Sequence, residues 1–247
     1  MKRAVVLAGG LGMRLRPYTA VLPKPLMPIG DRPVLDIVIR QLRHHGFDRV
    51  TIATGYLAEL IEAFFRDGQE YDVNVDYFRE HQPLGTVGAL ALIDGLDEPF
   101  LVMNGDVLTD MDYTAMFEHH VASGAAVTVA STSRHVNISL GVMEFDDPGA
   151  PEKLTHYVEK PTLSYEVSMG VYCFHPRVLD HIEPGARLDF PDLILRLLDR
   201  GERVEAWRPG AYWLDLGRHD DYELAMQEFE SVRHRLLPAD APAPPQP

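Results

Sequence analysis

The feature that most constrains the fold of this chain is a regular alternation of short apolar runs with longer segments of helical periodicity. The short runs are rich in β-branched residues and cover residues 4–7, 50–54, 73–77, 100–103 and 125–130. The helical segments between them cover residues 34–45, 57–65, 85–93 and 112–123. Apolar strands that alternate with helices are typical of a parallel sheet covered on both faces. The pattern therefore predicts an α/β fold with a single doubly wound, mostly parallel sheet.

The pattern of predicted strands and helices changes after about residue 139. Strand-like runs at residues 140–145, 154–158 and 169–174 are separated by turn-rich loops, which predicts a mixed-sheet lobe attached to the Rossmann-like sheet. Helical periodicity returns at residues 190–198 and 220–235. Because no linker divides these elements, we expect one domain over residues 1–236. Residues 237–247 are rich in Pro and Ala and are expected to form a disordered tail.

The charge balance restricts the class of partner. The 247 residues include 23 Lys and Arg against 37 Asp and Glu, a formal net charge of −14. Such a surface argues against a nucleic-acid partner, which requires a basic face. No apolar run approaches the roughly 20 residues of a membrane span, and glycines follow the start too soon for a signal peptide. We therefore expect a cytoplasmic protein without a membrane partner, and we interpret the single Cys173 as a buried structural thiol.

Positive charge nevertheless gathers around a glycine-rich segment near the start of the chain, Leu7-Ala8-Gly9-Gly10-Leu11-Gly12-Met13-Arg14. A glycine turn after a strand lets backbone N–H groups approach an anion, and an arginine adds a forked donor for phosphate oxygens. The dinucleotide fingerprint would need glycine at Leu15, and the Walker loop would need a Gly-Lys-Ser/Thr that is absent. From the glycines alone, an ordinary turn is the alternative.

The complete string of motifs resembles the sugar-phosphate nucleotidyltransferases. Five further motifs follow the glycine segment in the order of that family: Lys24-Pro25-Leu26-Met27-Pro28-Ile29, Pro83-Leu84-Gly85-Thr86, Asn104-Gly105-Asp106, Glu159-Lys160-Pro161 and Trp213-Leu214-Asp215-Leu216-Gly217. The resemblance implies that NTP phosphates bind the loop residues Leu7, Ala8, Gly9, Gly10, Gly12 and Met13. It also implies that Arg14 bridges the reacting phosphates and that Lys24 holds the sugar phosphate and the α-phosphate.

Two aspartates are candidate metal ligands. Asp106 and Asp215 each follow a short apolar run, so each is expected just beyond the carboxyl end of a strand, where α/β sheets bind ligands. Two carboxylates together with phosphate oxygens and water suit Mg²⁺. The alternative is that each aspartate caps a turn or a helix, and the resemblance favours the metal.

The nucleobase is expected near Glu80, Pro83, Gly85 and Thr86. Relatives that use thymidine or uridine nucleotides commonly have glutamine five residues before this glycine, where the chain has Glu80. A carboxylate only accepts hydrogen bonds, so it suits the N1–H and N2–H donors of guanine, and we expect GTP. Alternatively, Glu80 is a solvated charge and Gln82 or the backbone selects the base.

The sugar is expected near Asn104, Gly141, Glu159, Lys160, Ser168 and Val171, of which Glu159 and Lys160 match the family's Glu-Lys-Pro. Ser168 departs from the asparagine that relatives often carry, which leaves a modified hexose, a heptose or a cyclitol phosphate open. The resemblance implies transfer of a nucleoside monophosphate from an NTP to a sugar 1-phosphate, with release of pyrophosphate. It is also compatible with a homo-oligomer.

Three other functions compete with this interpretation. The acceptor could be another phosphorylated molecule such as phosphocholine. The chain could be a glycosyltransferase, although Asn104-Gly105-Asp106 replaces the Asp-X-Asp of that class. It could also be a catalytically silent nucleotide-binding subunit, which loss of Arg14, Lys24 or a metal aspartate would favour, and none of these is lost.

Overall fold

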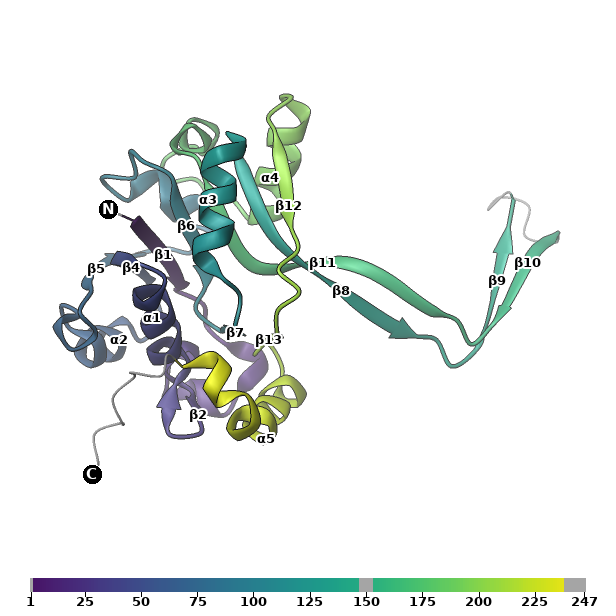
Figure 1. Ribbon diagram of the computed structural model, residues 1–247, viewed down its shortest axis with the longest axis horizontal. Coiled ribbons are helices and arrows are strands. Elements are labelled where there is room, and N and C mark those ends of the chain that lie inside the picture. The colour runs from purple at the N-terminus through teal and green to yellow at the C-terminus, as the bar shows by residue number, and fades with distance from the viewer. Residues whose placement is uncertain (1, 147–152, 238–247) are drawn as a thin grey trace.

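The computed structural model describes residues 2–146 and 153–237, and its centre is a seven-stranded sheet (Figure 1). The strand order is β12-β8-β11-β6-β1-β4-β5. Their bounds are β12 Val204–Trp207, β8 Val127–Asn137, β11 Thr162–Phe174, β6 Phe100–Asn104, β1 Lys2–Ala8, β4 Phe47–Thr54 and β5 Asn74–Arg79. Strands β6, β1, β4 and β5 are parallel, whereas β11 runs antiparallel to both β6 and β8. The predicted α/β fold with a mostly parallel sheet is confirmed.

Helices cover both faces of the sheet, because alternate residues of each central strand belong to different apolar clusters. Ala4 and Val6 of β1 pack with one set of helices, and Val5 packs with the other. The first set comprises α1 Val34–His44, α2 Ala58–Phe65 and α3 Tyr113–Ser123. The second comprises α4 Phe190–Asp199 and the 3-10 helices η5 Gly88–Leu92 and η6 Pro176–His181. Such double coverage explains why the strands read as continuous apolar runs.

A smaller layer joins the two ends of the chain. Helix α5, His219–Leu236, packs with the short pair β2 Pro28–Ile29 and β3 Arg32–Pro33. The pair β7 Val107–Thr109 and β13 Trp213–Asp215 connects this layer to the end of β6. The remaining 3-10 helices are η1 Met13–Leu15, η2 Tyr18–Ala20, η3 Lys24–Leu26 and η4 Gln69–Tyr71. None of the helices in the described ranges is long and apolar enough to span a bilayer.

The helix predicted over residues 85–93 is wrong in extent, because only the 3-10 turn η5 forms there. Gly85 has a φ of +78°, which is outside the helical region. The neighbouring backbone is committed elsewhere, since the N–H of Val87 donates to the carbonyl of Leu188 over 3.1 Å. These long-range hydrogen bonds replace the local ones that a helix would need.

The mixed second lobe is not a separate layer. Strands β8 and β11 begin in the main sheet and continue as a two-stranded ribbon, and β9 Gly141–Phe145 pairs with β10 Leu154–Glu159 at its far end. This β8/β11 ribbon with its β9/β10 tip, residues 132–146 and 153–168, is called the arm below. Figure 1 shows the arm projecting from the body. The tail predicted over residues 237–247 lies, from Pro238 on, outside the described residues.

Candidate active site

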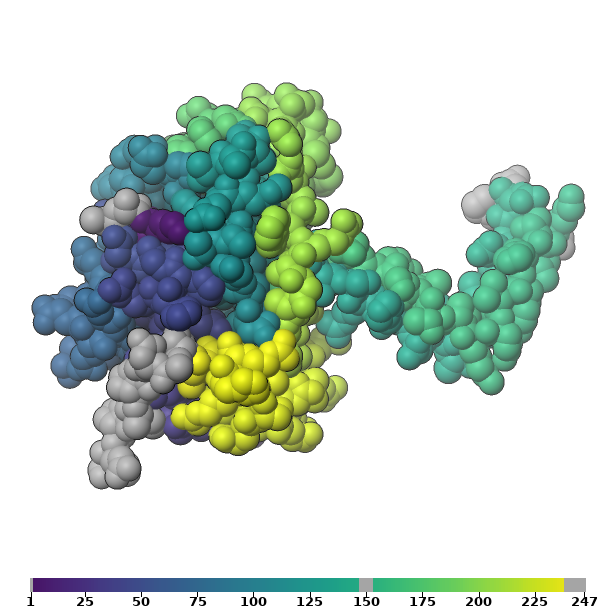
Figure 2. Space-filling model, viewed as in Figure 1, coloured from purple at the N-terminus to yellow at the C-terminus, as the bar shows by residue number. Residues whose placement is uncertain are grey.

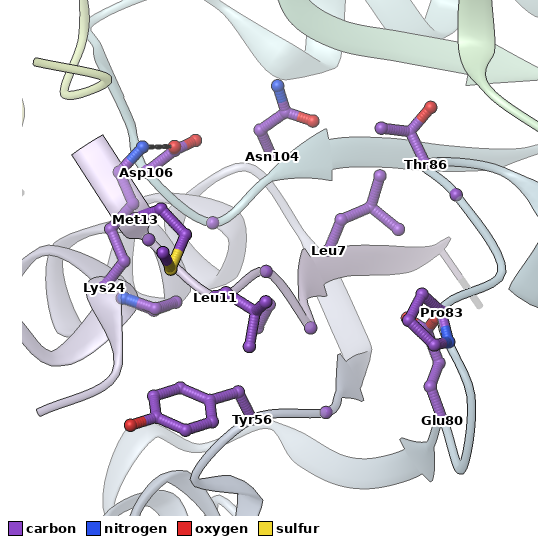
Figure 3. Close-up of a pocket in the computed structure, with 18 of the residues that line it drawn as sticks. Leu7, Leu11, Met13, Lys24, Tyr56, Glu80, Pro83, Thr86, Asn104 and Asp106 are labelled. Atoms are coloured by element: carbon purple, nitrogen blue, oxygen red, sulfur yellow. Dashed lines mark hydrogen bonds and ion pairs between the residues drawn. The ribbon is translucent and has the colours of Figure 1, made fainter. Parts of the chain in front are cut away.

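A cleft of about 700 Å³ opens at the carboxyl ends of β1, β4 and β6. It brings together most of the predicted site residues: Leu7, Ala8, Gly9, Gly10, Gly12, Met13, Arg14, Lys24, Glu80, Pro83, Gly85, Thr86, Asn104 and Asp106. In Figure 3, Lys24 and Asp106 lie at one end of the cleft, and Glu80 and Pro83 lie at the other. The glycine segment runs between these ends. The sequence predicts the phosphates at the first of these ends and the base at the second, so the two are called the phosphate end and the base end below.

The glycine segment is shaped by close contacts that exclude side chains. Gly12 has a φ of +59°, and a Cβ at this position would lie 2.8 Å from Cγ2 of Thr19. The Thr19 hydroxyl donates to the Gly12 carbonyl over 2.7 Å, which fixes the turn. A Cβ on Gly9 would lie 2.8 Å from Oε1 of Glu80. The positive φ thus favours glycine at position 12, whereas a side chain at position 9 would displace the carboxylate of Glu80.

The two predicted metal aspartates lie side by side although they are far apart in the sequence. Asp215 ends β13 and pairs in register with Val107 of β7, the residue after Asp106. The N–H of Leu216 also donates to the carbonyl of Asp106 over 3.1 Å. This antiparallel pairing brings Asp215 next to Asp106, which lines the phosphate end of the cleft, although Asp215 itself does not line it.

Positive groups accompany these carboxylates. Lys24 forms an ion pair with Oδ2 of Asp106, drawn as a dashed line in Figure 3. A Cβ on Gly217 would lie 3.4 Å from a terminal nitrogen of Arg14 and 3.1 Å from Oδ2 of Asp215, so the bare glycine keeps these two side chains near each other. Burial, followed by the charge of Asp106, raises the pKa of Asp215, and Lys24 and Arg14 oppose this shift.

The donor set suits a hard cation that completes its coordination with substrate. No group of three or more His, Cys, Asp or Glu side chains within the described ranges forms a ready metal site. Two neighbouring carboxylates are present, and burial together with the charge of Asp106 raises the pKa of Asp215, so a nearby cation would favour its ionised form. Oxygen ligands that leave positions for phosphate and water fit Mg²⁺ better than the softer metals.

Glu80 is held rigidly at the base end. It follows β5, and its N–H donates to the Thr54 carbonyl over 2.8 Å. Oε2 accepts the N–H of Leu84 over 3.1 Å, while Oε1 faces the glycine segment. The side chain is half-buried, and burial raises the pKa of its carboxyl group. A fixed acceptor with one oxygen turned towards the cleft is therefore available to a base.

Gly85 and Thr86 have packing roles that the sequence did not indicate. A Cβ on Gly85 would lie 2.4 Å from the Leu188 carbonyl, so glycine is needed here for close packing as well as for access. The Thr86 hydroxyl accepts the N–H of Phe190 over 2.6 Å, and its own N–H donates to Asp189 over 3.1 Å. The base end is thereby attached to the start of α4.

Some cleft residues were missed in the sequence. Gly55 and Tyr56 follow β4, and the rule that parallel strands end at one edge would have found them. Asp189 also lines the cleft, but only long-range hydrogen bonds bring it there, and no local signal marked it.

The predicted sugar residues are divided between three places. Asn104 lines the cleft and packs on Gly170, where a Cβ would lie 2.7 Å from its amide nitrogen. Val171 is fully buried and pairs with Met103, so it belongs to the core rather than to a pocket wall. Ser168 is exposed at the point where β11 leaves the sheet, and its hydroxyl donates to the Tyr172 hydroxyl over 3.2 Å.

Gly141, Glu159 and Lys160 lie on the arm and do not line the cleft. Gly141 begins β9 and Glu159 ends β10, and the two residues pair with each other. Because the arm projects away from the body (Figure 1), the structure does not bring these residues to the phosphate loop of their own chain.

This fold and cleft define a nucleotide-binding α/β protein with a glycine phosphate loop and a paired-carboxylate site. The family model described as "Nucleotidyl transferase" matches residues 3–232, and the chain belongs to this family. The resemblance drawn from the motifs is thus confirmed.

Three known proteins show how similar the chain is to its relatives. It is 36% identical to a UTP–glucose-1-phosphate uridylyltransferase of Synechocystis over 91% of this chain and 62% of the relative. It is 32% identical to a mannose-1-phosphate guanyltransferase of Schizosaccharomyces pombe over 89% of this chain and 62% of the relative. The crystal structure of HddC from Yersinia pseudotuberculosis covers 93% of this chain and 100% of its own at 26% identity, with a TM-score of 0.71. The chain thus spans 62% of the length of these two curated relatives.

Proposed function

We propose that this protein transfers a nucleoside monophosphate from an NTP to a sugar 1-phosphate and releases pyrophosphate. The observation that carries the proposal is the convergence of Arg14, Lys24, Asp106 and Asp215 beside the glycine segment, at one end of a 700 Å³ cleft. The names of the uridylyltransferase and guanyltransferase relatives support the same reaction class.

The residues supply positioning and charge, and no protein nucleophile is needed. The acceptor phosphate is largely dianionic at neutral pH, because its second pKa is near 6, so it can attack the α-phosphorus directly. Backbone N–H groups of the glycine segment bind the triphosphate, and Arg14 neutralises charge on the reacting phosphates. Lys24 would contact both the α-phosphate of the donor and the phosphate of the acceptor. Its present partner, Asp106, holds the ammonium group in position until substrate arrives. Positioning and electrostatic stabilisation by these groups are the main source of rate.

Asp106 and Asp215 would hold Mg²⁺. When bound, this ion neutralises the triphosphate and stabilises charge on the pyrophosphate leaving group. The ion would also offset the burial of Asp215 and the nearby charge of Asp106, which together raise the pKa of Asp215.

GTP is the proposed nucleotide. The fixed carboxylate of Glu80 can accept the paired N1–H and N2–H donors of guanine, whereas a pyrimidine edge offers more acceptors than donors. A second crystal structure of the Yersinia HddC, which is 25% identical to this chain, is described as complexed with GMP-PN, and the fission-yeast relative is a guanyltransferase. The Synechocystis relative is named for UTP, so the base is the finer part of the proposal.

A pyrophosphate-release panel tests both parts. Each NTP is crossed with glucose, mannose and heptose 1-phosphates, a cyclitol phosphate and phosphocholine, with Mg²⁺ and with EDTA. Mg²⁺-dependent release with GTP and a sugar 1-phosphate is expected. Release with another NTP corrects the base, and release only with phosphocholine or a cyclitol phosphate corrects the acceptor. Binding of NTP without release in any combination would identify a silent subunit and refute the proposal.

A further inference from the structure

The arm stands clear of the body beyond its base, where Arg208 forms an ion pair with Glu166 over 3.3 Å (Figures 1 and 2). It begins where the outer neighbours of its strands end: β12 pairs with β8 only as far as Ala130, and β6 pairs with β11 only from Val171 onwards. Beyond the pair Ser131–Ser168, six residue pairs, from Thr132–Val167 to Asn137–Thr162, form a ribbon without a further strand beside it. At about 3.4 Å per residue this ribbon is roughly 20 Å long. A two-stranded ribbon of this kind is only marginally stable in water by itself.

The two faces of the ribbon differ in character. Residues directly opposite in an antiparallel pair share a face, so the register assigns each side chain. One face carries every apolar side chain of the ribbon, and we call it the apolar face of the arm: Val136, Leu163, Tyr165 and Val167, with Thr132 and Arg134 as its two polar members. The other face is entirely polar: Ser133, His135, Asn137, Thr162, Ser164 and Glu166. Such alternation is typical of a sheet that packs against another surface on one side. In this chain that side is bare, and Tyr165 is 53% exposed.

The tip continues this pattern and carries the predicted sugar residues. Met143 pairs with Tyr157, and the next pair on the same face is Gly141 with Glu159. The Tyr157 hydroxyl donates to Oε2 of Glu159 over 3.1 Å. A Cβ on Gly141 would lie 1.8 Å from that hydroxyl, so only glycine lets the tyrosine lie across it. The tip thus presents a carboxylate held in place by an aromatic ring, a combination suited to a hydroxyl-rich ligand.

The cleft offers a matching surface. The exposed apolar side chains Leu11 and Met13 belong to the glycine segment, and the exposed Tyr18 and Val21 follow it in the sequence. Leu11 and Met13 also line the cleft. No residue of the arm lines the cleft, although the arm carries the only described Glu-Lys-Pro motif. The cleft therefore contains the predicted nucleotide-binding residues but not Glu159. The tip of the arm carries Glu159 but lies away from the cleft of its own chain.

We propose that two copies of this chain exchange arms, so that the tip of one copy completes the sugar end of the cleft in the other. This inference rests on the proposed function, because it assigns Glu159 and Tyr157 to the acceptor of that reaction. Strand β8 is one unbroken strand from the sheet into the arm, so folding the arm back onto its own cleft would require breaking it. A second copy meets the arm without such a change, and a twofold axis uses both arms alike.

The area of the arm is sufficient for a stable dimer. Ribbon and tip together are about 37 Å long, and two strands are about 10 Å wide, which gives roughly 370 Å² for each arm face. Covering both arms and the surfaces beneath them buries about 1,500 Å², within the range of specific protein interfaces.

Complementation between two inactive variants tests the exchange. Asp106→Ala removes a proposed metal ligand from the cleft and leaves the arm intact. Glu159→Ala removes the carboxylate of the tip and leaves the cleft intact. The two are co-expressed with different tags, and the mixed species is purified through both tags. Each variant alone should lose most of its pyrophosphate release. The mixed dimer contains one cleft with every group intact, so it should regain about half of wild-type turnover.

Every other outcome contradicts either the arm exchange or the proposed function. Failure to purify a doubly tagged species, a doubly tagged species without activity, or full activity of Glu159→Ala alone would overturn the arm exchange. An inactive wild type would instead refute the proposed function, and the doubly tagged purification would still decide whether a dimer forms.

Sedimentation provides a second measurement that does not depend on activity. Tyr165→Asp places a charge on the apolar face of the arm and should convert the dimer to a folded monomer. The matched control His135→Asp places the same charge on the polar face and should leave the dimer intact. A wild-type chain that sediments as a monomer at micromolar concentration, or equal behaviour of the two variants, would overturn the proposal.

Discussion

Replacing Glu80 with glutamine should change which nucleotide the enzyme prefers while leaving the fold intact. The glutamine carbonyl can still accept the Leu84 N–H, which is now 3.1 Å from Oε2. The amide nitrogen then takes the position of Oε1 beside the glycine segment and faces the N–H donors of guanine. The favourable contact between the carboxylate oxygen and a guanine N–H thus becomes an unfavourable contact between two donors. With uracil or thymine, the same amide finds one acceptor and one donor.

The size of the effect follows from the value of a paired base contact. A bidentate pair discriminates between bases by about 1–3 kcal/mol, which corresponds to roughly 5- to 150-fold in kcat/KM for GTP. Pyrophosphate release with GTP and with UTP is measured at substrate concentrations below KM, and the ratio of the two values is compared with wild type. The control is Glu98→Gln, which removes an exposed carboxylate outside the cleft. An unchanged GTP-to-UTP ratio in a folded Glu80→Gln variant would show that the base is selected by another group.

Three further predictions concern catalysis and stability. Arg14→Ala and Asp106→Ala should each lower kcat at least about 100-fold in single-turnover assays with an unchanged circular dichroism spectrum, and near-normal turnover would contradict their roles. Gly12→Ala should cost about 1–3 kcal/mol in urea unfolding, because φ is +59° and the new methyl group meets Thr19, and a cost near zero would show that the turn adapts. Burial lowers the pKa of His120 from 6.5 to about 4, so the folded state binds fewer protons than the unfolded state between these values. Stability should therefore fall by up to about 3 kcal/mol as the pH drops from 7 to 4, and this loss should be smaller in His120→Gln, whereas equal pH dependence would exclude the histidine as its source.

Much of the body was predictable because its signals are local. Each buried parallel strand needs an apolar run, and each covering helix needs an apolar stripe, so both leave a mark within a few residues. Motifs placed directly after strands, such as the glycine segment and Asn104-Gly105-Asp106, meet at one edge of the sheet because parallel strands all end there. The sequence thereby predicted the α/β fold and most of the cleft lining.

Long-range pairing decided what the sequence could not. Asp215 reaches Asp106 only through the pairing of β13 with β7, and residues 85–93 lose their helix to hydrogen bonds with Leu188. The motif around Val171 predicted that this residue lines the sugar pocket, but its pairing with Met103 places it in the core. The course of the arm is also set by register, since β8 and β11 keep pairing after their outer neighbours end. An apolar pattern shows that a face is covered, but the partner that covers it is fixed by contacts between distant segments, and these exist only in the folded chain.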